Sequence, residues 1–448
     1  MNKIDFSIFF INFINIFRFF LSGCFVTLLL ISNLNPTENK KLENGISVIF
    51  DTDPSATTTA IQIWISAGAV NEDKNISGIS HFVEHLIFKG TPTKTQKQIA
   101  PEIEKFGGII NAATSKDFTY FYSIAPSSYS LKAAEILTDV VLNPLFPEEE
   151  IEKERKIILE EIKRKDDEPQ SQLFDEFYSY VYRNFFRYAQ RVIGTEETVS
   201  KLKRDDFLSF HRKFYIPENM FIVVSGNFDK KEMFSFLKNS PALAGLKKTK
   251  RKKDRTIIYN SIPENKLSQK KIIKKDISQA YIIMGFPAAN IKSSDQYSLD
   301  IASYVMGTGR ASRLYKKLVE ETKIAYGISA SFVTHKGPGL FYVYAECSSE
   351  NISAASNKVL IELSQLTCEN VTDEELDRAR VLLIRDKLLQ EQTPDGKAEE
   401  LGFYAVLGNR KIAESYIKNI KKVKPQDIKN VISKYLIFPN IPTVVITP

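Results

Sequence analysis

The chain has 448 residues, of which 43% are hydrophobic and 26% are charged. These proportions are typical of a folded globular protein and exclude an intrinsically disordered one, and the length predicts two or more domains. The net charge is +7, and the three cysteines have neither the spacing of a metal site nor that of a disulfide framework. Any metal ion must therefore be held by nitrogen and oxygen ligands.

The N-terminal segment is the first feature along the chain. Residues 6–32 are almost wholly apolar and are long enough to span a bilayer. We predict that residues 1–38 are a signal peptide or a signal anchor rather than part of the fold. Residues 21–24 (LSGC) resemble a bacterial lipoprotein box, although the residues after Cys24 stay apolar. Cleaved, lipidated and membrane-anchored forms all fit this pattern, and each places the protein in the bacterial periplasm or on the periplasmic face of the inner membrane.

The first half of the remaining chain mixes strand and helix patterns. Alternation and β-branched or aromatic composition mark the expected strands, and apolar spacing at three and four residues marks the expected helices. The expected strands are 45–50, 57–66, 118–124 and 219–226, and the expected helices are 95–106, 130–142 and 147–163, in addition to the stretch 78–91.

The second half repeats this plan after a basic segment. Its expected elements are strands 280–286 and 340–347 and helices 294–306 and 311–321, and residues 371–380 echo residues 146–155. We interpret the lysine-rich residues 246–276 as a solvated linker, because no nucleic-acid-binding module accompanies them. The chain is therefore expected to have an α+β fold of two homologous domains, 39–245 and 277–448, each an antiparallel sheet covered by helices.

The stretch 78–91 carries the strongest chemical signal. On a helix, His81, Glu84 and His85 fall on one face. Two imidazoles one turn apart can hold a zinc ion, and a carboxylate beside them can take a proton from a water molecule at the metal. This H-x-x-E-H pattern is specific here, because the chain has only four histidines. The alternative is a helix with two hydrogen-bonded, partly buried histidines. Residues 312–316 (SRLYK), at the matching place in the second half, include no zinc ligand.

A catalytic zinc site needs a third protein ligand. The predicted helix 147–163 offers Glu154 and Glu161 two turns apart on one face, with Glu150 one turn earlier. A run of glutamates is also typical of the solvated start of a helix. Spacing alone therefore leaves the choice of the third ligand open.

Several motifs together resemble the pitrilysin/insulysin family of inverted-motif zinc peptidases. They are residues 78–90, GGxxNAxT at 107–114, ERxxIxxEI at 154–162 and PxNM at 217–220. The similarity covers about residues 40–445 and is closest to the short, two-domain bacterial and mitochondrial-processing-peptidase branch. It implies a clamshell of two domains around a chamber, one zinc ion per chain, and hydrolysis of peptides or unfolded segments.

The family motifs assign roles by position. His81, His85 and Glu161 correspond to the zinc ligands, and Glu84 corresponds to the general base. Glu154 corresponds to a supporting acidic residue that orients a ligand.

The resemblance also implies a substrate-binding surface. Asn111 and Ala112 correspond to a strand edge along which the family binds peptides as an added β-strand. The second domain of the family contributes an arginine and a tyrosine, seven residues apart, that grip the substrate carbonyl. Tyr326 matches the tyrosine, which gives it a catalytic and substrate-binding role, but Val319 stands at the arginine position.

A valine offers no hydrogen-bond donor to an oxyanion. Either a nearby arginine such as Arg310 or Arg313 replaces the missing one, or a partner subunit supplies the pair. We therefore expect a homodimer or heterodimer with another subunit of this family, and no nucleic-acid partner. The alternative function is a non-catalytic or partner-dependent subunit that uses the same clamshell for assembly or peptide binding.

Overall fold

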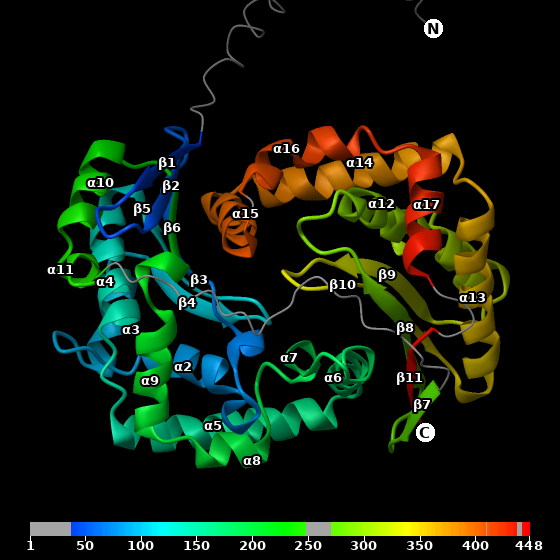
Figure 1. The fold of residues 1–448 in the computed structure, drawn as a ribbon, viewed down its shortest axis with the longest axis horizontal. Helices are drawn as coiled ribbons and strands as arrows, with labels where there is room; N and C mark the ends of the chain where they lie inside the picture. The colour runs from blue at the N-terminus through cyan, green and yellow to red at the C-terminus, as the bar shows by residue number, and fades with distance from the viewer. Residues whose placement is uncertain (1–36, 248–269, 409, 437–440) are drawn as a thin grey trace, which may run out of the picture.

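The computed structural model describes residues 37–247, 270–408, 410–436 and 441–448. Two sheets, each accompanied by helices, form two halves that face each other (Figure 1). Nearly all of the predicted signal segment, residues 1–38, and most of the predicted linker lie outside the described residues. Within the described ranges, no helix combines the length and the apolar character needed to cross a membrane.

The first sheet has six strands in the order β1-β2-β6-β3-β5-β4. All neighbouring strands are antiparallel except β2 and β6, which run parallel. The central strand β3 is almost wholly buried, whereas β5 alternates buried and half-buried residues. β4 forms one edge of the sheet. The strands are β1 Glu38–Lys41, β2 Ser47–Thr52, β3 Thr58–Ile65, β4 Ile109–Thr114, β5 Thr119–Pro126 and β6 Met220–Gly226.

The second sheet has five strands in the order β7-β11-β8-β10-β9. Its single parallel pair is β11 with β7, and the other neighbours are antiparallel. β9 forms the edge opposite β7. The strands are β7 Lys270–Lys274, β8 Ala280–Ala288, β9 Gly327–Val333, β10 Gly339–Cys347 and β11 Thr443–Thr447.

Helices cover both sheets (Figure 1). Those of the first half are α2 Ile79–Ile87, α3 Gln96–Glu104, α4 Ser130–Leu142, α5 Glu148–Asp167, α6 Pro169–Val181, α7 Phe186–Ala189, α8 Glu196–Lys201, α9 Arg204–Phe214, α10 Lys230–Asn239 and α11 Pro241–Ala244. Those of the second half are α12 Asp295–Gly307, α13 Ile352–Cys368, α14 Asp373–Gln390, α15 Pro394–Leu407, α16 Lys411–Ile420 and α17 Pro425–Tyr435.

Each half contributes one helix that packs on the sheet of the other half. α15 of the second half packs on β3 and β6 of the first sheet, and α6 of the first half packs on β8 and β11 of the second (Figure 1). β3 serves both arrangements because its side chains alternate between the two faces. Ile61 and Ile63 belong to the core of their own half, whereas Ala60 and Trp64 belong to the core built with the second half. This arrangement explains why both faces of β3 are buried.

The predicted fold class, two halves of sheet and helices, is confirmed. The sheets are not purely antiparallel, because β6 and β7 each join a neighbour through a long crossover that makes a parallel pair possible. The predicted linker 246–276 was too long at its C-terminal end. Lys270–Lys274 forms the edge strand β7, where lysines are common because they discourage pairing with another chain.

The helix expected over 311–321 also differs. Tyr315–Glu321 forms a π-helix, whose wider turn is visible in the bond from Thr322 N–H to the carbonyl oxygen of Lys317, five residues earlier. The stretch matching the His81 motif is therefore not a regular α-helix in the second half.

Candidate metal centre

The helix α2 separates its apolar and polar residues cleanly. Phe82, Val83 and Leu86 are fully buried in the core of the first half. His81 and His85 lie on the other face and are only partly buried. Their ring centroids are 4.7 Å apart, as the one-turn spacing requires. The apolar face therefore fixes the helix and leaves both imidazoles turned toward the neighbouring helix α5.

Glu161 on α5 meets both histidines. Its Oε2 atom lies 3.8 Å from His81 Nε2 and 3.9 Å from His85 Nε2, and one donor atom from each of the three residues lies within 4.8 Å of the others. Ligands of a tetrahedral zinc ion are roughly 3.3 Å apart, so a small contraction would bring all three onto one ion. Two imidazoles and a carboxylate are also a donor set of catalytic zinc sites. In the described part of the chain no other group of histidine, cysteine or acidic residues converges in this way.

Glu154 sits beside this group, two turns before Glu161. Its Oε2 atom is 3.1 Å from His85 Nδ1, and its Oε1 atom is 2.6 Å from Lys89 Nζ. A proton on His85 Nδ1 donated to Glu154 leaves the lone pair of Nε2 directed at the metal position. Burial alone would raise the pKa of Glu154, but the bonds from His85 and Lys89 outweigh it and hold the pKa below its ordinary value. Glu154 is thus placed to orient His85.

His81 is in the protonation state that metal binding needs. Burial, together with the neighbouring His85 and Lys165, lowers its pKa to about 3, so the imidazole is neutral at physiological pH. A neutral imidazole has a lone pair for a metal ion. The Nδ1 atom of His81 is buried and has no hydrogen-bond partner among the described residues.

Glu84 shares the polar face of α2 and is held by a strand of the sheet. The Thr114 hydroxyl, at the end of β4, donates a hydrogen bond of 2.5 Å to Glu84 Oε2. Burial raises the pKa of the Glu84 carboxyl, and the nearby Glu161 adds to this, while Thr114 and His85 act in the opposite direction. A carboxyl group with a raised pKa is suited to accepting and returning a proton near neutral pH.

The predicted substrate-binding residues lie on sheet edges. Asn111 and Ala112 are on β4, whose outer side has no neighbouring strand in the sheet, and Asn111 is exposed. Tyr326 immediately precedes β9, the corresponding edge of the second sheet, and 62% of its surface is exposed. Val319 instead packs against the core of the second half.

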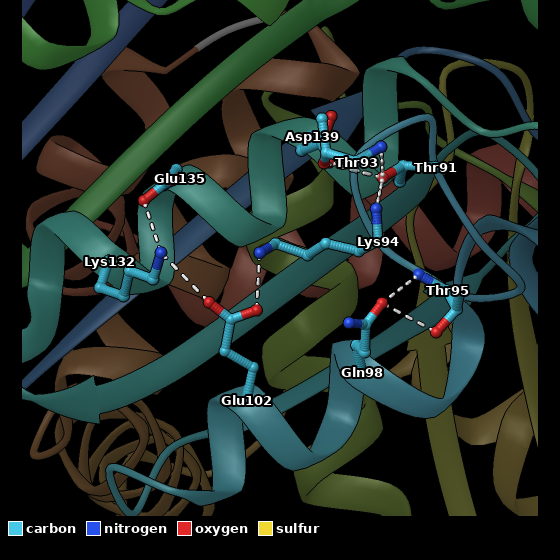
Figure 2. A network of polar contacts seen from close by, with 9 residues as sticks. All are labelled: Thr91, Thr93, Lys94, Thr95, Gln98, Glu102, Lys132, Glu135 and Asp139. Carbon is cyan, nitrogen blue, oxygen red and sulfur yellow. Dashed lines mark hydrogen bonds and ion pairs between the residues drawn. The ribbon is translucent and has the colours of Figure 1, made fainter.

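The segment after α2 is fixed by a polar network (Figure 2). Thr91 Oγ1 donates to Asp139 on α4 at 2.7 Å, and Lys94 pairs with Glu102 on α3 at 2.6 Å. These contacts hold the chain directly after Lys89, which pairs with Glu154. The network therefore supports the C-terminal end of α2 from outside the metal group.

Three residues near the metal group were not singled out as functional from the sequence. Lys89 contacts Glu154, and Thr114 contacts Glu84. Lys165 Nζ lies 3.6 Å from Glu161 Oε1. Lys165 follows Glu161 by four residues, so helical spacing could have identified it. Nothing in the sequence relates Lys89 or Thr114 to their partners, because those contacts join elements that are distant along the chain.

Comparison with known proteins identifies relatives over most of the chain. The family model described as "Insulinase (Peptidase family M16)" matches residues 47–196, and that described as "Peptidase M16 inactive domain" matches residues 201–383. A protein of Rickettsia felis named as an uncharacterized zinc protease is 32% identical over 90% of this chain and 95% of its own length. A Bacillus subtilis protein of similar name is 27% identical over 85% of this chain and 91% of its own length.

Solved structures share the fold. A protease from Helicobacter pylori superimposes with a TM-score of 0.85 at 24% identity, covering 93% of this chain and all of the other. A Pseudomonas fluorescens structure described as a peptidase M16 inactive domain has a TM-score of 0.82 at 17% identity, covering 92% of this chain and 98% of the other. Together with the sequence matches, these results confirm the resemblance seen in the motifs. The chain belongs to the insulinase family, peptidase family M16.

Proposed function

We propose that this protein is a zinc-dependent metalloendopeptidase that hydrolyses peptides or unfolded protein segments. The observation that carries the proposal is the convergence of His81, His85 and Glu161 on one position, with Glu84 on the same face of α2. The names of the curated relatives, which describe zinc proteases, support the same reading.

The residues of the site have separate roles in the proposed hydrolysis of a peptide bond. When bound by His81, His85 and Glu161, zinc would lower the pKa of a water molecule and polarise the scissile carbonyl. Glu84 accepts the proton of the attacking water and returns it to the leaving amine. Thr114 fixes the Glu84 carboxylate through its hydrogen bond, so that the base does not have to be ordered during the reaction.

The substrate in this proposal is an extended chain. β4 is an edge strand at Asn111 and Ala112, where the Ala112 N–H donates to the Asn111 side chain at 2.9 Å, and such an edge suits a peptide added as a further strand. An extended or unfolded segment can be added to an edge strand in this way, whereas a folded domain cannot.

Two variants test the assignment of roles. We expect Glu84→Gln to bind zinc with a stoichiometry near one and to cleave a quenched fluorescent peptide library about 10²–10⁴ times more slowly, because the base is lost. His85→Ala should lose both zinc and activity, whereas the control Glu160→Gln, which changes an exposed ion pair on α5, should retain both. Cleavage by Glu84→Gln at the wild-type rate would show that Glu84 is not the base.

The proposal also includes a partner and an exported location. Val319 in place of the family arginine favours a second subunit of the same family, in a homodimer or heterodimer, and the N-terminal apolar segment favours export. Co-purification of the exported form tests both. Zinc-replete protein that cleaves no peptide alone but does so with its partner would identify the partner-dependent alternative.

A further inference from the structure

The helix that carries His81 and His85 lacks a capping side chain of its own. α2 begins after Gly78, whose φ of +93° lies in the left-handed region, and no side chain at that position caps the helix. A Cβ atom on Gly78 would meet the backbone of Ile193 and Gly194 within 3 Å. Serine, threonine or aspartate therefore cannot occupy the usual capping position here. The first N–H groups of α2 need an acceptor from elsewhere.

Glu72 supplies this acceptor from six residues upstream. Its Oε2 atom accepts the N–H of Gly78 at 2.7 Å, and its Oε1 atom accepts the N–H of Ser80 at 2.8 Å. Glu72 is completely buried. Both carboxylate oxygens are thus committed to the N-terminal turn of α2, and Ser80 directly precedes His81.

Glu72 is itself held in place. The short 3-10 helix Ala69–Asn71 precedes it, and the carbonyl oxygen of Glu72 accepts a bond from the Gln190 side chain at 3.3 Å. The partly buried Lys116 lies close enough to influence the carboxyl electrostatically. Burial raises the pKa of Glu72 to about 7, which its bonds to Ser80 and Gly78 partly offset. Glu72 and its two bonds to α2 are therefore part of the protein interior rather than a surface contact.

Two bonds of this kind matter for such a short helix. α2 has nine residues, and isolated helices of this length are not stable in water. When ionised, the Glu72 carboxylate also faces the positive end of the helix dipole, where anions are favoured. The apolar face fixes the helix against the core, and the bonds at Gly78 and Ser80 oppose fraying of its first turn. That turn carries His81.

From this geometry we infer that Glu72 is a positioning residue for the metal centre, which fixes the first turn of α2 so that His81 meets His85 and Glu161 at ligating distance. The inference rests on the proposed zinc-binding function. Glu72 does not touch the metal ligands and acts only through the backbone. The isosteric variant Glu72→Gln places an amide NH₂ opposite one of the two backbone N–H donors, so one bond is lost and replaced by a repulsive contact.

The test compares Glu72→Gln with wild type and with Asp300→Asn. Asp300 is a matched control, because it is a carboxyl group of the second half whose pKa is likewise raised by burial to about 7 and which accepts one bond, from Tyr416. Zinc affinity is measured by competition with a chromophoric chelator, and the unfolding midpoint is measured on metal-free protein. We expect Glu72→Gln to bind zinc about 10–100 times more weakly, and Asp300→Asn to bind it within twofold of wild type.

Hydrogen exchange on metal-free protein separates this inference from the proposed function. Faster exchange at the Gly78 and Ser80 amides in Glu72→Gln, with unchanged exchange in α4, is the expected result. Zinc affinity and α2 exchange equal to wild type in Glu72→Gln would overturn the inference. If wild type itself binds no zinc, the proposed function fails, and the exchange data alone then decide whether Glu72 orders the turn. Should Glu72→Gln not fold, Glu72→Asp, whose shorter side chain cannot span both donors, replaces it with the same expected direction.

Discussion

The acidic residue behind His85 allows the sharpest test of the candidate metal centre. We consider Glu154→Gln, which keeps the shape of the side chain and removes its charge. In the structure the Glu154 side chain is 7% exposed. Its Oε2 atom lies 3.1 Å from His85 Nδ1, and its Oε1 atom lies 2.6 Å from Lys89 Nζ. A glutamine can offer its single oxygen to only one of these donors, and its NH₂ group must then face the other.

Two separate losses follow from this geometry. Removing one partner of a buried ion pair costs about 3–5 kcal/mol, and because the Lys89 side chain retains 17% exposure we expect a smaller loss of unfolding free energy, about 2–3 kcal/mol. Loss of the group that orients a metal-ligating histidine lowers metal affinity about 10–100-fold, which is about 1.4–2.7 kcal/mol. Glu154→Gln should therefore weaken zinc binding without abolishing it.

Zinc affinity from chelator competition and unfolding free energy from urea titration of metal-free protein measure the two losses independently. Glu160→Gln is the control, because it removes the same charge from the same helix at a pair that is 72% and 58% exposed. The control should change the unfolding free energy by no more than about 0.5 kcal/mol and leave zinc affinity within twofold. Equal zinc affinities of Glu154→Gln and wild type would refute the orienting role of Glu154.

Two further predictions concern the second half and its contact with the first. Gly402→Ala places a Cβ atom against the buried indole of Trp64, the sole tryptophan. Although alanine has the better helix propensity, we expect this contact to lower the unfolding free energy by about 1–2 kcal/mol and to change the fluorescence emission of Trp64. An unchanged emission spectrum and unfolding curve would contradict the packing of α15 on the first sheet. Asp300 has a folded-state pKa of about 7, above its ordinary value of 3.8, so wild-type stability falls as pH rises through this window. Asp300→Asn does not titrate, so its unfolding free energy relative to wild type should rise between pH 4 and pH 8, by up to about 4 kcal/mol. Urea titrations that show the same difference at both pH values would argue against a raised pKa of Asp300.

Elements with a strong local pattern could be predicted from the sequence. The helix expected over 130–142 is α4, Ser130–Leu142, and the strand expected over 340–347 is β10, Gly339–Cys347. Both depend on apolar spacing within the segment itself, which does not require knowledge of the rest of the chain. The common face of His81, Glu84 and His85 followed for the same reason, because four residues span one helical turn.

The choice among the glutamates of α5 could not be made in this way. Spacing left Glu150, Glu154 and Glu161 open, and only family resemblance assigned their roles. In the structure Glu150 pairs with Lys153 at 2.9 Å, while Glu161 faces the two histidines. Which face of α5 meets α2 is set by the packing of two helices that are more than sixty residues apart in sequence. The packing of α6 and α15 on the opposite sheets was hidden for the same reason. The contact of Glu72 with Gly78, only six residues later, was hidden because it depends on the conformation of the loop between them.

In the proposed function, Val319 stands where the family has an arginine, and the structure limits how the second half could supply a donor to the substrate carbonyl. Tyr326 is 62% exposed beside β9, whereas the partly buried Val319 packs against the core of the second half and offers no donor. Arg313, one of the two neighbouring candidates, is held by two bonds of 2.6 and 2.7 Å to Glu375 on α14. Freeing its guanidinium would break the ion pair with Glu375, which is costly for a half-buried pair. An arginine from a second subunit avoids this cost, whereas activity of the isolated chain that depends on Arg310 would show that the chain completes the site by itself.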